Sequence, residues 1–196
     1  MNVTATGTAG RLEGRRPQAL VHRWPTAAGI VFAVFVAAGG DAADIAPVVT
    51  ASGFVYVAAA AVQRRAAAWP MFFATFVVIG IGTAVPGLAP AWASWWMLVI
   101  AAVLVAYGLI RGAIRPPWGV PLQTAAMVVL TAASIIAASA DAMWAGLLVG
   151  AGLLAHAAWD VYHHRVARVV TRSMAEFCAV LDVIVAIVVL GATFVW

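Results

Sequence analysis

The sequence has little charge, one cysteine and no lysine. Only 9% of its 196 residues are charged, against about 25% in soluble domains, and 65% are hydrophobic. No soluble fold of this size could cover so much apolar surface, so the composition predicts an all-α integral membrane protein. The single Cys178 excludes an internal disulfide and two-thiol redox chemistry. Without lysine, the chain cannot form a retinal Schiff base or any other lysine imine.

All 11 basic residues are arginines, and the isoelectric point is near 10.2. Such a value can indicate a nucleic-acid partner. Here, however, the arginines border apolar segments, which is typical of membrane proteins, so we expect a lipid bilayer and no nucleic acid as partner. The bias toward Ala, Val and Arg without lysine is typical of a high-GC bacterial genome. It predicts a multi-pass protein of the bacterial cytoplasmic membrane.

Seven apolar stretches approach or reach the roughly 20 helical residues that cross a bilayer. We place them at residues 26–40, 45–62, 69–84, 92–110, 121–138, 142–164 and 174–194. Residues 1–24 are polar and lack the short apolar core and cleavage site of a secretory signal. The pattern predicts a flexible basic cytoplasmic tail over residues 1–24, followed by a seven-transmembrane-helix bundle over residues 25–196.

The arginines fall at alternate ends of these stretches. If the N-terminus is inside, the tail and the loops after the second, fourth and sixth spans hold four, two, two and three arginines, which is all 11. The other turns hold none, and they carry Asp41, Asp44 and Asp141. The positive-inside rule therefore predicts a cytoplasmic N-terminus and, with seven spans, a C-terminus outside.

Most ionisable residues within the spans lie in the last two. A charge at the bilayer centre costs about 2.5–3.5 kcal/mol on insertion scales, so it indicates a functional site. His156, Asp160 and His163 follow the spacing i, i+4, i+7 and share a helix face, with His164 at its edge. Counted from the arginine-bearing ends, Asp182 and His156 are each about nine residues, or roughly 13 Å, deep. We therefore expect the last two spans to bring them together.

The first interpretation of this set is a metal site. Imidazole and carboxylate are ligands of Zn²⁺ and Fe²⁺. We expect His156, Asp160 and Asp182 to be the inner ligands and His164 an outer one. One ion cannot bind every member, because His156 and His163 are about 10 Å apart along the helix axis.

His163 and Glu176 are the candidate catalytic residues, expected to move protons. Glu176 has a second interpretation, because Ser173-x-x-Glu176 matches a capping box at the start of the last helix. Other cofactors are excluded. Four histidines, one of them in the tail, are too few for a di-iron set of histidine boxes, and only His156 is deep enough for haem, so a bis-histidine haem cannot form.

Three functions remain open. The first is a metal-dependent enzyme acting on a lipid or another apolar substrate. The second is a small proton- or cation-coupled transporter or channel, with Asp41 and Asp44 at the opposite mouth unless they are only helix caps; no inverted repeat or broken helix pair supports it. The third is a non-catalytic subunit of a membrane complex. Gly146-x-x-x-Gly150 permits close helix packing, either within the bundle or in an oligomer.

Overall fold

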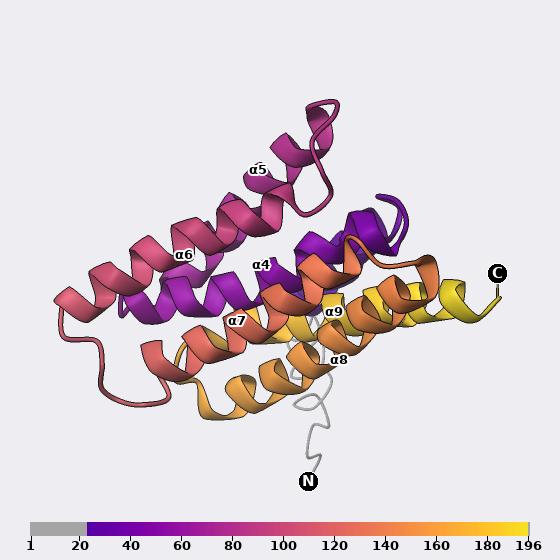
Figure 1. Ribbon diagram of the computed structural model, residues 1–196. Coiled ribbons are helices and arrows are strands. Elements are labelled where there is room, and N and C mark those ends of the chain that lie inside the picture. Colours follow the sequence, from indigo (N-terminus) through magenta and orange to yellow (C-terminus); the bar gives the residue numbers. More distant parts are fainter. Residues whose placement is uncertain (1–22, 196) are drawn as a thin grey trace, which may run out of the picture.

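The structure is a computed structural model that describes residues 23–195. These residues form α-helices and one 3-10 helix, and no strand occurs among them. The elements are α3 (Trp24–Ala37), α4 (Ala42–Ala61), η1 (Arg65–Ala67), α5 (Ala68–Ala84), α6 (Trp92–Ile110), α7 (Val120–Ala137), α8 (Ala142–Val166) and α9 (Arg172–Val195) (Figure 1). The predicted tail lies outside the described residues, apart from its last two.

The helices coincide with the predicted spans, and each observed end lies within three residues of the expected one. Of the helices in residues 23–195, six are long and apolar enough to cross a membrane. The exception, α3, has 14 residues and a length of about 21 Å, shorter than the roughly 30 Å of a hydrocarbon core. The predicted all-helical class is confirmed, and the length and hydropathy of these six helices support a membrane protein.

Helix α4 lies in the middle of the bundle and packs against α5, α6, α7 and α8. Small residues permit this position: a Cβ added at Gly53 would lie only 3.0 Å from the Cα of Met127 on α7. Hydrogen bonds add to the packing. Ser134 on α7 donates to the carbonyl of Ala46 on α4 at 2.6 Å, and its Oγ lies 2.9 Å from that of Ser94 on α6. Such contacts fix α4 between its neighbours.

Helices α8 and α9 form the antiparallel pair that the sequence predicted, and they pack closely along their length. The two glycines of the G-x-x-x-G segment face α9. A methyl group at Gly146 would collide with Thr193, and one at Gly150 would collide with Leu190. Both glycines therefore serve packing within one chain, and an oligomer formed through them stays a prediction.

Side chains cap three of the helices. Asp141 accepts a hydrogen bond from the backbone N–H of Trp144 and caps α8. Asp41 caps α4 by accepting from two backbone N–H groups of its first turn. At the start of α9, Thr171 accepts from the N–H of Met174. These caps satisfy donors that have no partner within the helix.

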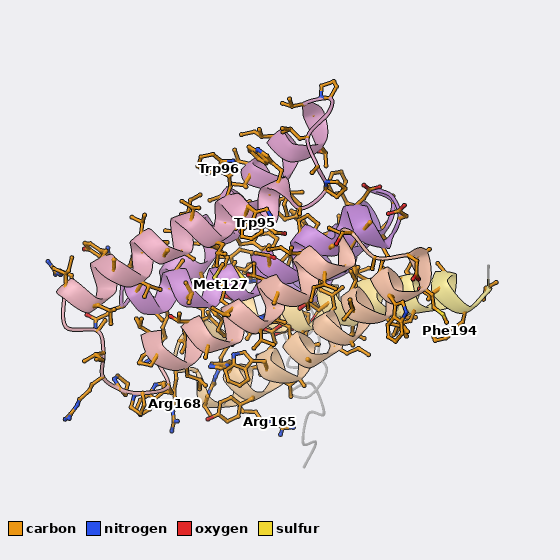
Figure 2. All side chains as sticks on the ribbon, in the orientation of Figure 1. Trp95, Trp96, Met127, Arg165, Arg168 and Phe194 are labelled. Carbon is orange, nitrogen blue, oxygen red and sulfur yellow. The ribbon has the colours of Figure 1, made fainter. Side chains whose placement is uncertain are left out.

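The bundle has two chemically different ends. One, here called the arginine side, carries Arg23 and the loops that follow α4, α6 and α8; the aspartate side carries Asp41, Asp44 and Asp141. Figure 2 shows Arg165 and Arg168 at the first end and Phe194 at the other. Toward the aspartate side, the α5–α6 hairpin leans away from the remaining helices (Figure 1). A cavity described below lies on that side of α4.

Candidate functional site

Helices α8 and α9 bring His156, Asp160 and Asp182 together in the interior; we call these residues the buried triad. Nδ1 of His156 lies 2.8 Å from Oδ2 of Asp182 and 3.1 Å from Oδ2 of Asp160. The three side chains are buried, and one potential ligand atom from each lies within 4.8 Å of the others. The contact expected from the equal depth of His156 and Asp182 is therefore present.

Tyr56 on α4 completes this polar cluster. Its hydroxyl donates to Oδ1 of Asp160 at 2.6 Å, and its ring packs edge-on against the rings of His156 and His163, with centroids 5.2 Å and 4.8 Å away. Tyr56 was not among the residues predicted from the sequence to form the site. The signal was present, because it is the one phenol in a segment of α4 otherwise composed of small and apolar residues.

Two buried polar atoms of the triad have no hydrogen-bond partner among residues 23–195: Nε2 of His156 and Oδ2 of Asp160. Oδ2 of Asp160 lies 3.1 Å from Nδ1 of His156, but a single N–H donates well to only one acceptor. Oδ2 of Asp182 is closer to Nδ1, at 2.8 Å, so we assign the hydrogen bond to Asp182. Buried polar atoms in native proteins almost always have a partner. An unpartnered carboxylate oxygen beside a second carboxylate is suited to a proton or a cation.

The charges of the triad do not balance. Among the described residues, only His156 forms an ion pair with Asp160 or Asp182. Arg165 and Arg172, which border the turn between α8 and α9, are exposed. One imidazolium cannot neutralise two ionised carboxylates, and an uncompensated buried charge is costly. The site therefore favours either a proton on one carboxyl group or a bound cation.

A cavity of about 390 Å³ adjoins the triad between α3, α4, α5 and α9; we call it the central cavity. Asp182, Cys178 and Ser52 line its inner part, and Asp44 lines it near the aspartate side. Most of the other lining residues are apolar. The volume falls in the usual range for small-molecule sites, about 300–1,000 Å³.

A second cavity of about 330 Å³ lies on the other face of α4, between α4, α7 and α8. Tyr56 and His156 line it, together with Trp159 and Gln123, whose side chains form a hydrogen bond of 3.3 Å. The His156–Asp182 pair thus lies between two cavities, with one member lining each.

The outer histidines do not join the triad's ligand atoms. Nδ1 of His163 lies 3.0 Å from the carbonyl of Trp159, within the same helix, while the ring packs on Tyr56. Nδ1 of His164 lies 3.1 Å from the carbonyl of Arg172, at the turn between α8 and α9. His163 is next to the cluster, and His164 is at its arginine-side edge.

Glu176 lies on a different face of α9. It accepts a hydrogen bond from Thr26 of α3, and its Oε1 lies 3.7 Å from Nη1 of Arg23. These contacts join the first turns of α3 and α9. The capping box proposed for Glu176 does not form, because Thr171 rather than Ser173 accepts at the start of α9.

Asp41 and Asp44, the second expected cluster, separate into two roles. Asp41 is a helix cap. Asp44 also lies in the first turn of α4, and its side chain lines the central cavity.

The arrangement as a whole can hold a cation or move a proton at the triad, beside a cavity that suits an apolar molecule. Comparison of the chain with models of protein families, with curated proteins and with solved structures finds no match.

Proposed function

We propose that this protein is a metal-dependent enzyme acting on a lipid or another apolar substrate, with a divalent ion such as Zn²⁺ or Fe²⁺ held by the buried triad. The observation that carries the proposal is the convergence of three ligand atoms from His156, Asp160 and Asp182 beside the central cavity. One nitrogen and two carboxylate oxygens form a donor set that both ions accept.

Charge supports the same reading. A neutral imidazole and two carboxylates carry two negative charges, which a divalent ion balances within a low-dielectric interior. The unpartnered Oδ2 of Asp160 would gain a partner in the same step. The hydroxyl of Tyr56 would hold the other oxygen of Asp160, as residues that support metal ligands commonly do.

A metal ion in this position would supply a water molecule activated for nucleophilic attack. The apolar lining of the central cavity favours the hydrocarbon portion of a substrate. The polar portion of that substrate would lie at Asp182, beside the other ligand atoms. His163, whose ring packs on Tyr56, would carry a proton in this step. Glu176 faces α3, so we assign it no part in this step.

The chain would lie in a bacterial cytoplasmic membrane, crossing it seven times with the N-terminus inside and the C-terminus outside. The arginine distribution supports this orientation, because all the arginines of residues 23–195 lie on one side. Helix α3 would cross a locally thinned bilayer or extend through its flanking residues.

Elemental analysis of detergent-purified protein tests the metal. We expect about one Zn or Fe per chain, lost in His156→Ala and in Asp182→Ala because each removes a ligand. His164→Ala and Glu176→Gln are matched controls that should keep the metal. Stoichiometric metal that survives both ligand substitutions, or no metal after gentle purification, contradicts the proposal.

Activity needs a separate test, because the substrate is proposed only by its chemical class. Reconstituted protein would be incubated with a bacterial lipid extract, and lipid species would be compared by mass spectrometry between the wild type and Asp182→Ala. We expect at least one species to be consumed only by the metal-loaded wild type. Identical lipid profiles with a metal-loaded protein would be consistent with metal binding but would contradict the proposed enzymatic activity.

One observation favours a second function, a cation or proton pathway. Asp44 and Asp182 line the same central cavity, Asp44 near the aspartate side and Asp182 in the interior. Proton or cation flux into proteoliposomes that is abolished by Asp44→Asn, and retained in Asp41→Asn, would favour this function over the enzyme.

A further inference from the structure

Three loops on the arginine side enclose a pocket of about 310 Å³, here called the arginine pocket. Arg64 and Arg65 reach it from the segment after α4, Arg115 from the α6–α7 loop and Arg168 from the α8–α9 loop. No lining residue is acidic. Residues far apart in the sequence thus place four guanidinium-bearing side chains around one hollow.

These four arginines have no ion-pair partner among residues 23–195, where the one arginine ion pair joins Arg23 to Glu176. The positive-inside rule explains why arginines lie on this side of the bundle. It does not explain why arginines from three loops line one pocket that contains no carboxylate. Arginine charges that line one pocket repel one another, and an anion between them would replace this repulsion with attraction.

Two other features of the arginine pocket suit an anion. The guanidinium of Arg168 lies 4.7 Å from the ring centroid of Trp118, which is half-exposed, so the ring holds this side chain over the pocket. Helix α7 begins at the pocket wall with Gly119 as its N-cap, and no side chain caps it. The positive end of the helix dipole therefore adds to the arginine charge.

The deeper wall of the pocket is apolar and buried, formed by Ala59, Ala113, Val120 and Val169. Such a wall beneath a ring of arginines matches the boundary between a phosphate group and the apolar part of a lipid. Guanidinium groups bind phosphate through paired hydrogen bonds. Basic pockets between transmembrane helices on the cytoplasmic side are recognised sites for anionic headgroups.

We propose that the arginine pocket binds a phosphate-bearing anion, either the headgroup of an anionic phospholipid or free phosphate. This site is separate from the buried triad, which lies in the interior between α4, α8 and α9. Ligand at the arginine pocket would join the loops after α4, α6 and α8, and would stabilise their relative positions.

Native mass spectrometry of the detergent-purified full chain tests the proposal, with phosphatidylglycerol or phosphatidylcholine added in mixed micelles. We expect phosphatidylglycerol to be retained at least tenfold more strongly than phosphatidylcholine. The double variant Arg64→Gln/Arg168→Gln should lower the apparent affinity about tenfold or more, because it removes charge-assisted hydrogen bonds. Competition by millimolar inorganic phosphate shows that the phosphate group itself is recognised.

The matched control is Arg111→Gln/Arg165→Gln, which removes the same charge from the same side at residues that do not line the pocket. Equal loss of lipid in both double variants would overturn the proposal, because a general surface potential would explain it. If Arg64→Gln/Arg168→Gln does not elute as a single species, Arg115→Gln alone, at an exposed loop residue, replaces it.

The source of the phosphate follows from the same measurements. Retention of phosphatidylglycerol that phosphate displaces only partly identifies a lipid site. Binding of inorganic phosphate without preference between the two lipids identifies a free-anion site. Binding of neither phosphatidylglycerol nor phosphate to the wild type would overturn the proposal in both forms.

Discussion

Nδ1 of His156 and Oδ2 of Asp182 lie 2.8 Å apart across the interface of α8 and α9, with side chains 3% and 1% exposed. The pair is the shortest polar link between these two helices, and it forms where neither partner has access to bulk water. Loss of His156 would leave the buried carboxylates of Asp160 and Asp182 without a partner, whereas loss of Asp182 would leave His156 beside Asp160, so removal of His156 should be the more harmful change.

Replacing His156 with Ala should lower the free energy of unfolding by about 3–5 kcal/mol, the usual cost of leaving a buried charge without its partner. Asp182→Asn should cost less, because an amide can still hydrogen-bond His156. Unfolding by SDS in mixed micelles would measure both. The double variant His156→Leu/Asp182→Leu should cost less than the sum of its single changes. Strict additivity would mean that the two side chains act independently.

Tyr56→Phe should weaken the site while leaving the packing intact. It removes the hydroxyl that donates to Asp160 but keeps the ring against His156 and His163. If the triad holds a metal, losing this supporting hydrogen bond should reduce the metal affinity by about 10–100-fold. Competition with a fluorescent chelator would measure the change, and Tyr107→Phe, at a residue 48% exposed, is the control. An unchanged affinity would show that Tyr56 does not support the ligands.

Helix packing gives a prediction that does not depend on function. An added Cβ at Gly29 of α3 would lie 2.8 Å from the carbonyl oxygen of Phe177 on α9, and a backbone atom cannot rotate away. Gly29→Ala should therefore destabilise the protein by about 1–3 kcal/mol. Gly80→Ala, which meets nothing within 4 Å, should be neutral or slightly stabilising. Similar thermal midpoints for the two variants would place α3 away from α9.

Topology can be measured with fused reporters. A reporter after Arg65 should be active only inside the cell and one after Trp196 only outside, because all the arginines border the same side. If the reporter after Trp196 is active inside the cell, the chain crosses the membrane one time fewer than proposed. The short α3 would be the first helix to doubt, since the other six of residues 23–195 meet the length and hydropathy expected of a span.

The helices could be predicted because each feature that defines them is local. Apolar length, the prolines near helix starts and the arginines at alternate loops locate the spans without knowledge of the neighbours. The meeting of His156 with Asp182 could also be predicted, because two antiparallel helices joined by a short turn place equal depths side by side. Simple geometry was sufficient for that contact.

Other features depend on contacts that a single sequence does not reveal. Tyr56 reaches Asp160 from a helix 104 residues earlier in the chain, so no spacing rule connects them. Glu176 turned toward α3 because α3 and α9 run side by side, a neighbour relation that hydropathy does not encode. The central cavity is lined by residues of α3, α4, α5 and α9, so it likewise depends on how helices that are distant in the sequence meet.

Cys178 lies on α9 one helical turn before Asp182, is 6% exposed and lines the central cavity. Because it is the sole thiol of the chain, it is also a native chemical reporter that needs no engineered background. A small thiol reagent that reacts with the folded protein must have entered the cavity, and a molecule that fills the cavity should slow that reaction. Screening lipids for protection of Cys178 would therefore identify molecules that occupy the central cavity.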